Sequence, residues 1–133
     1  MNSNGFVLTG LLSEARCNEI AWEPYAADGR NNVDIFRLYD AREANQGPAA
    51  ALLRYKPGAR VTRHVHAGYE LIFVIEGALI NDTGVHRAGS LEICSPGSAH
   101  ALASEEGCVF LVVWEQPVCV VMEEVRLAAA AAH

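Results

Sequence analysis

The sequence predicts an all-β fold in a single domain, and three features of the chain lead to this prediction. Short apolar segments recur about every ten residues, the spacing of strands and turns in a β-sandwich or small barrel. Turn-forming pairs such as Asp28-Gly29, Pro57-Gly58 and Pro96-Gly97 separate these segments. Helical periodicity is weak, and no internal repeat indicates a second barrel.

The expected elements follow the chain in order. A short helix over residues 11–19 would be capped by the Ser13 hydroxyl. The expected strands are residues 19–22, 33–39, 50–55, 61–66, 71–75, 79–80, 91–94, 100–103, 109–114 and 118–122. Residues 71–75 are continuously apolar, so we expect that strand to be covered on both faces, as in a barrel of two packed sheets. A hairpin is expected near residues 82–84.

Composition excludes several classes of protein. The 133 residues fit one domain, and 51% hydrophobic with 20% charged residues is typical of a soluble globular protein. A net charge of -6 argues against nucleic-acid binding, and no apolar stretch reaches the roughly 18 residues that span a membrane. We expect residues 123–133 to be a frayed tail.

The four cysteines favour a cytoplasmic protein. They form no C-x-x-C pair, and no signal peptide is recognisable, so reduced and mostly buried thiols are expected. Cys94 and Cys108 are the candidates for a redox or metal-binding role, because they lie nearest the motifs described next.

Two histidines and a glutamate stand at fixed offsets between Gly58 and Gly77. His64 and His66 are two residues apart, so on an extended chain they point to the same face of a sheet. Glu70 begins the next apolar segment, and a tight bend over residues 67–69 would fold it back beside them. Imidazole and carboxylate groups that converge in this way bind divalent metal ions. The pattern therefore predicts a metal site.

A third histidine, His100, follows the turn at Pro96-Gly97. Proline and glycine at these positions suit a type II turn, which would direct the next strand back toward the first two histidines. We expect His100 to be a further ligand. His86 lies outside both motifs and is interpreted as an edge histidine rather than a fifth ligand, whereas Glu92 is a weaker candidate to support a ligand from behind.

These positions resemble the cupin superfamily. Its first motif is matched at all five defining positions, which are Gly58, His64, His66, Glu70 and Gly77. Its second motif is matched at Gly89, Gly97 and His100, whereas Ser95 and Ser104 stand where proline and asparagine are usual. The resemblance implies a single-domain cupin, a double-stranded β-helix or jelly-roll barrel, over roughly residues 18–122.

A narrower resemblance is to the cupin domain of ChrR-type anti-sigma factors and their stand-alone relatives. It rests on residues 64–70, 82–84, 97–100 and 104–108, on an upstream Trp-Glu-Pro stretch, and it covers roughly residues 18–117. The N-terminal helical domain with which those anti-sigma factors bind a sigma factor is not expected in this chain. Small cupins of this kind imply a homodimer that pairs N-terminal strands.

The resemblance implies that His64, His66, Glu70 and His100 hold one divalent ion per chain. With Fe(II), Mn(II) or Ni(II) in octahedral geometry two positions stay open, and a dioxygenase-like enzyme acting on a small molecule in the barrel is expected, ahead of an isomerase or lyase. With tetrahedral Zn(II) the four ligands close the site, and a sensor or ligand-binding module without turnover is the alternative.

Aromatic residues are the remaining candidates for catalytic and pocket-lining roles if the protein is an enzyme. Tyr69 and Tyr55 are the candidate proton donors nearest the ligands, and with Phe73, Phe110 and Trp114 they are candidates to line the pocket, although core packing is the more common role for each of these five.

Overall fold

The structure is a computed structural model that describes residues 5–27 and 29–121. The elements are α1 (Glu14–Asn18), β1 (Glu23–Pro24), β2 (Arg30–Asp40), β3 (Ala49–His66), β4 (Glu70–Asn81), β5 (Gly84–Arg87), β6 (Leu91–Cys94), β7 (Ala99–Ser104), β8 (Cys108–Trp114) and β9 (Val118–Val120). The expected all-β fold is confirmed. The frayed tail expected at residues 123–133 lies outside the described residues.

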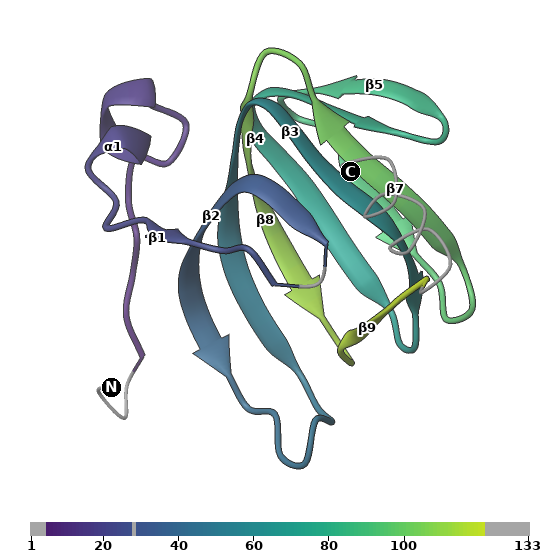
Figure 1. Cartoon of the computed structure of the whole chain (residues 1–133). Coiled ribbons are helices and arrows are strands. Elements are labelled where there is room, and N and C mark those ends of the chain that lie inside the picture. The colour runs from purple at the N-terminus through teal and green to yellow at the C-terminus, as the bar shows by residue number, and fades with distance from the viewer. Residues whose placement is uncertain (1–4, 28, 122–133) are drawn as a thin grey trace.

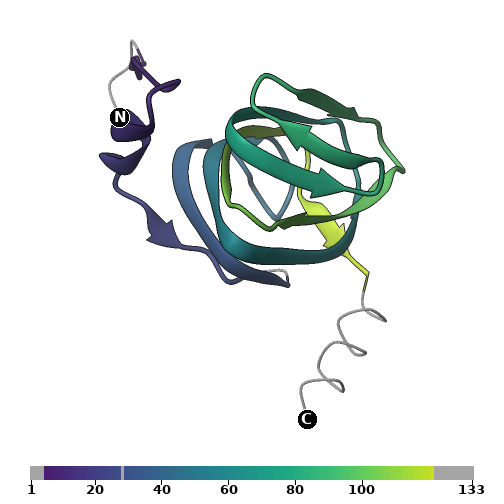
Figure 2. The ribbon, with the colours of Figure 1, turned by 90° about the horizontal axis from the view of Figure 1, so that it is seen from above.

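The strands close into one barrel, seen from above in Figure 2. The hydrogen-bonded path runs β1-β2-β3-β7-β4-β5; β8 joins β3 to β4, while β6 extends from β4 and β9 from β3. All these pairs are antiparallel. The helix α1 lies outside the barrel, beside its N-terminal strands (Figure 1). No helix among the described residues is long and apolar enough to cross a membrane.

The expected helix is present but shorter than residues 11–19. Ser13 caps it by accepting a hydrogen bond from the backbone N–H of Arg16 at 3.4 Å. The strand expected at residues 19–22 is wrong. Glu19 has helical backbone angles and ends the helix, and the N–H of Trp22 bonds the carbonyl of Ile20, so the chain turns there.

Two pairs of expected strands are single bent strands. Residues 50–55 and 61–66 both belong to β3, and residues 71–75 and 79–80 both belong to β4. Each long strand bends at a glycine with positive φ, Gly58 at 86° and Gly77 at 76°. Along β3, pairing passes from β8 at Tyr55 to β7 at Ala59, so the bend carries one strand from one part of the barrel to the next.

The prediction that residues 71–75 are covered on both faces is only half correct. Ile72 and Val74 point into the main core, but Leu71 is 41% exposed. The main core fills the barrel and includes Tyr55, Phe110 and Trp114. A second cluster, which includes Cys17 and Ile20, packs α1 against the outside of the barrel.

The expected hairpin joins β4 to β5, where Asn81 pairs with Gly84. The side chain of Asn81 accepts a hydrogen bond from the backbone N–H of Thr83 at 2.8 Å, which fixes the turn. The strand β5 that follows carries no continuous apolar run and was absent from the expected elements. Its alternation of half-buried and exposed residues explains the missing apolar signal.

Candidate metal centre

Four side chains that the motifs predicted lie together at one end of the barrel. His64 and His66 lie at the C-terminal end of β3, and Glu70 is the first residue of β4. His100 lies on β7 and pairs with His64 across the two strands. Each of the four is buried, with at most 4% exposure. One ligand atom from each lies within 4.8 Å of the others. The bend over residues 67–69 and the turn at Pro96-Gly97 place them there.

The three imidazole rings face one another without stacking. Their centroids are 4.5 to 5.2 Å apart, and their planes are nearly perpendicular, at 86° to 90°. Rings arranged in this way approach one point from three directions. That geometry suits three ligands of a single ion.

Hydrogen bonds hold the Nδ1 atom of each ring and leave Nε2 for the centre. Nδ1 of His64 lies 3.3 Å from the carbonyl of Thr62, and Nδ1 of His66 lies 3.0 Å from the carbonyl of Ser98. A carbonyl only accepts, so both Nδ1 atoms carry the proton. Nδ1 of His100 lies 3.1 Å from the carboxylate of Glu92. This pattern is typical of histidines that bind metal through Nε2.

The atoms left at the centre fit a cation. Nε2 of His66 lies 2.9 Å and Nε2 of His100 lies 3.5 Å from the same oxygen, Oε2 of Glu70. All three atoms are buried, and among the described residues none has a partner in hydrogen-bond alignment. Buried polar atoms are rarely left unpaired, and a divalent ion would satisfy all three at once.

Electrostatics of the cluster also depend on Glu70. Burial lowers the pKa of His64 to about 4. For His66 and His100, burial lowers the pKa, but the nearby Cys94 thiol and the Glu70 carboxylate outweigh it and raise the values to about 9 and about 11. Burial raises the pKa of Glu70, and its close contacts with His100 and His66 outweigh this effect and lower the pKa to about 2. Without a bound cation, protons on His66 and His100 therefore balance the negative charges of Glu70 and Glu92, whose carboxylate lies 3.1 Å from Nδ1 of His100.

The residues that support His100 were indicated only weakly by the sequence. Glu92 contacts Nδ1 of His100, as its candidate role required, and Asn81 donates to the same Glu92 oxygen at 2.9 Å. The thiol of Cys94 lies 3.9 Å from the same ring nitrogen. His86 lies on β5 and bonds Asn81 and Thr83, outside the four-residue cluster.

Two residues that support the cluster, Ser98 and Asn81, were not predicted from the sequence. Ser98 holds His66, and its hydroxyl donates to the carbonyl of Ser95 at 2.6 Å, so its oxygen accepts from the ring. The position of Ser98 in the turn before His100 could have indicated this role. Nothing in the sequence indicated the role of Asn81, because only the fold brings β4 beside β6.

The two candidate tyrosines lie in different surroundings. Tyr69 is 53% exposed in the bend between β3 and β4. Tyr55 is buried in the main core with its ring edge-on to Phe110, the centroids 5.0 Å apart, and burial raises its pKa, so it stays protonated. Phe110 and Trp114 belong to the same core, while Phe73 packs against the second cluster, outside the barrel.

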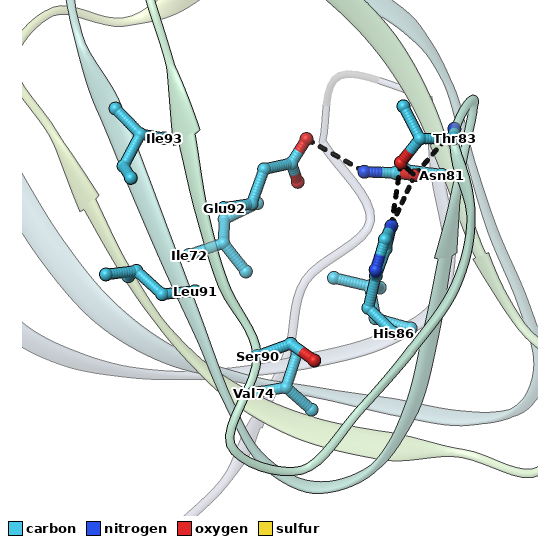
Figure 3. Close-up of a pocket in the computed structure, with 10 residues that line it drawn as sticks. Ile72, Val74, Asn81, Thr83, His86, Ser90, Leu91, Glu92 and Ile93 are labelled. Atoms are coloured by element: carbon cyan, nitrogen blue, oxygen red, sulfur yellow. Dashed lines mark hydrogen bonds between the residues drawn. The ribbon is translucent and has the colours of Figure 1, made fainter.

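A cavity of about 320 Å³ lies between β4, β5 and β6 (Figure 3). Its lining residues are Ile72, Val74, Leu79, Asn81, Thr83, His86, Ser90, Leu91, Glu92 and Ile93. None of the four clustered residues is among them, but Glu92 belongs to this wall and also touches His100.

The barrel and its buried cluster define the chain as a cupin. More narrowly, the chain belongs to the family described as the ChrR cupin-like domain, which matches residues 13–118. It is 35% identical over 74 residues to the anti-sigma-E factor ChrR of Cereibacter sphaeroides, a match that covers 53% of this chain and 35% of that protein. The chain thus spans about a third of the curated relative it matches.

Solved structures share the fold. The Rhodobacter sphaeroides SigE complex with the anti-sigma ChrR matches with a TM-score of 0.59 and 27% identity, over 74% of this chain and 50% of that chain. An acetylacetone dioxygenase from Acinetobacter johnsonii matches with a TM-score of 0.64 and 18% identity, over 73% and 69%. At that identity the second likeness establishes the fold alone.

Proposed function

We propose that this chain is a mononuclear divalent-metal module of the sensory kind, related in role to the cupin of anti-sigma factors. His64, His66, Glu70 and His100 would hold the ion. The observation that carries the proposal is the closed centre, in which three buried atoms without aligned partners surround one point. A tetrahedral Zn(II) would be saturated by these four ligands, so it would stabilise the barrel rather than bind substrate.

The family supports this choice over a purely structural barrel. The relative at 35% identity is an anti-sigma factor, and a related solved complex holds its sigma factor. We infer that metal loss would loosen the end of the barrel where β3, β4 and β7 meet, and so change a contact with a protein partner. A sigma factor is the partner class that these relatives suggest. The three buried thiols, Cys17, Cys94 and Cys108, suit a cytoplasmic setting.

A dioxygenase-like enzyme is the second candidate, and the cavity favours it. An octahedral ion such as Fe(II) would keep two positions beyond these four ligands and would supply Lewis-acid or redox chemistry there. A small substrate would fit the 320 Å³ space that adjoins His100 through Glu92. Tyr69 and Tyr55 are weaker proton-donor candidates for this function, because one is half exposed and the other is packed in the core.

The test measures metal content by elemental analysis of purified protein and of two histidine variants. We expect one Zn(II) per chain in the natural sequence, loss of stoichiometric metal in His66→Ala, and full retention in His86→Ala, whose histidine lies outside the cluster. Full occupancy in His66→Ala would mean that the ligand assignment is wrong. Bound iron together with dioxygen uptake on diketones, catechols or thiols after anaerobic Fe(II) loading would favour the enzyme instead.

A further inference from the structure

The polar wall of the cavity is a single hydrogen-bonded chain that ends on His100. Three of its members, Asn81, Thr83 and His86, come from the β4–β5 hairpin, and the fourth, Glu92, comes from β6. Figure 3 shows these side chains gathered on one side of the cavity. Most of the other lining residues are apolar: Ile72, Val74, Leu79, Leu91 and Ile93.

The backbone sets the direction of this chain of hydrogen bonds. The N–H of Thr83 donates to Oδ1 of Asn81 at 2.8 Å, so the amide group of Asn81 has only one possible orientation. Its Nδ2 therefore donates to Oε2 of Glu92 at 2.9 Å. The same Oε2 lies 3.1 Å from Nδ1 of His100 and accepts the proton there.

The other oxygen of Glu92 is left without a hydrogen bond. Oε1 is buried and has no hydrogen-bond partner among the described residues, although Oε2 has two. Figure 3 shows Oε1 turned toward the space that the lining residues surround. A carboxylate oxygen accepts and never donates, and an unpaired one in a buried place is costly.

We propose that this cavity binds a small molecule with an apolar body and one uncharged hydroxyl-type donor, which bonds Oε1 of Glu92. The volume equals that of roughly ten water molecules at about 30 Å³ each, which suits a single substituted ring. No lysine or arginine stands among its described lining residues, so nothing there would balance an anion. A divalent ion at the neighbouring centre would repel an ammonium group.

Glu92 also couples the two sites. A donor on Oε1 withdraws charge from the carboxylate, so Oε2 holds the Nδ1 proton of His100 less strongly and Nε2 becomes a weaker ligand. The ligand and the metal should therefore weaken each other by the same factor. The ligand site itself stands without the metal; this coupling and the exclusion of an ammonium group rest on the proposed function.

The test uses three probes with the same body, para-cresol, para-methylanisole and para-toluate, titrated by calorimetry into metal-free and Zn(II)-loaded protein. Para-cresol should bind at least tenfold more tightly than para-methylanisole, which has no donor, and para-toluate should bind weakest. In Glu92→Gln the amide oxygen must face Asn81 and His100, which places an NH₂ donor in the cavity. The preference for para-cresol over para-methylanisole should then shrink, because a hydroxyl can also accept from NH₂, and para-toluate, which only accepts, should gain the most affinity.

Glu105→Gln makes the same chemical change at an exposed surface position and should keep the natural order. Equal binding of para-cresol and para-methylanisole by the natural sequence, no binding of any probe, or an undiminished preference for para-cresol in Glu92→Gln would each overturn the ligand site. Zn(II) content, measured on the same samples, reports separately on the four-residue cluster. A chain that binds para-cresol but no metal would contradict the proposed function and leave the ligand site standing.

Discussion

At the scale of single residues, the three histidines of the cluster differ in what lies behind each ring. His64 and His66 are held by backbone carbonyls, which cannot change their charge, whereas His100 is held by the carboxylate of Glu92. A carboxylate makes the imidazole a stronger donor to a metal than a carbonyl does. His100 is thus the ligand most open to adjustment by its surroundings.

The shifted pKa values of two ligands predict that metal binding depends on pH. A metal must displace the protons that Glu70 holds on His66 and His100, whose pKa values are raised to about 9 and about 11. The apparent affinity should therefore rise with pH between 6.5 and about 9, by roughly ten- to a hundredfold per pH unit for one or two displaced protons. Chelator competition over this range measures it. Calorimetry in two buffers of different ionisation enthalpy counts the protons, and no release would contradict the prediction.

At the scale of elements, bent strands bring the ligands together. The spacing of His64, His66 and Glu70 is a local feature, and alternation along a strand was enough to predict that they converge. The bends themselves were not predictable in the same way. Pro57-Gly58 and Gly77 resemble strand ends, yet the strands continue through them because β7 pairs with β3 beyond Gly58 and β5 pairs with β4 beyond Gly77.

The bend at Gly77 predicts a specific loss of stability in Gly77→Ala. A Cβ there would lie 2.9 Å from Cα of Cys108 and would also collide with the carbonyl oxygen of Gly107, both parts of the backbone. The control is Gly84→Ala, also at positive φ but with nothing within 4 Å of the new Cβ. We expect Gly84→Ala to cost about 1–2 kcal/mol and Gly77→Ala about 1–3 kcal/mol more. Urea denaturation compares them, and equal losses would mean that the backbone shifts to make room.

At the scale of the whole molecule, the N-terminal segment leaves apolar side chains in solvent. Phe6, Val7 and Leu12 are 53%, 84% and 82% exposed, and Phe6 and Tyr39 of β2 line a common hollow. We call these four residues the N-terminal apolar patch. Such a patch beside short edge strands is typical of an interface, and it supports the homodimer that we propose.

Light scattering tests this assembly. The natural sequence should be dimeric at micromolar concentration, and Phe6→Asp should shift it to a monomer, because a carboxylate would be buried at the interface. Val85→Asp, at a 56% exposed position on β5, should leave the dimer intact. A monomer in the natural sequence would contradict the proposal, and a dimer in Phe6→Asp would place the interface elsewhere.

The all-β class and the four clustered residues could be predicted from the sequence, because strand alternation and turn chemistry are short-range properties. The family could be predicted because its motifs are short stretches of sequence. His100 could be predicted for the same reason, since the Pro96-Gly97 turn directs the strand on which His100 lies. The residues that support the ligands from behind could be identified only in the folded barrel. Asn81 and Glu92 meet across β4 and β6, and neither residue type nor spacing along the chain encodes which side chains a closed barrel brings within 3 Å of each other.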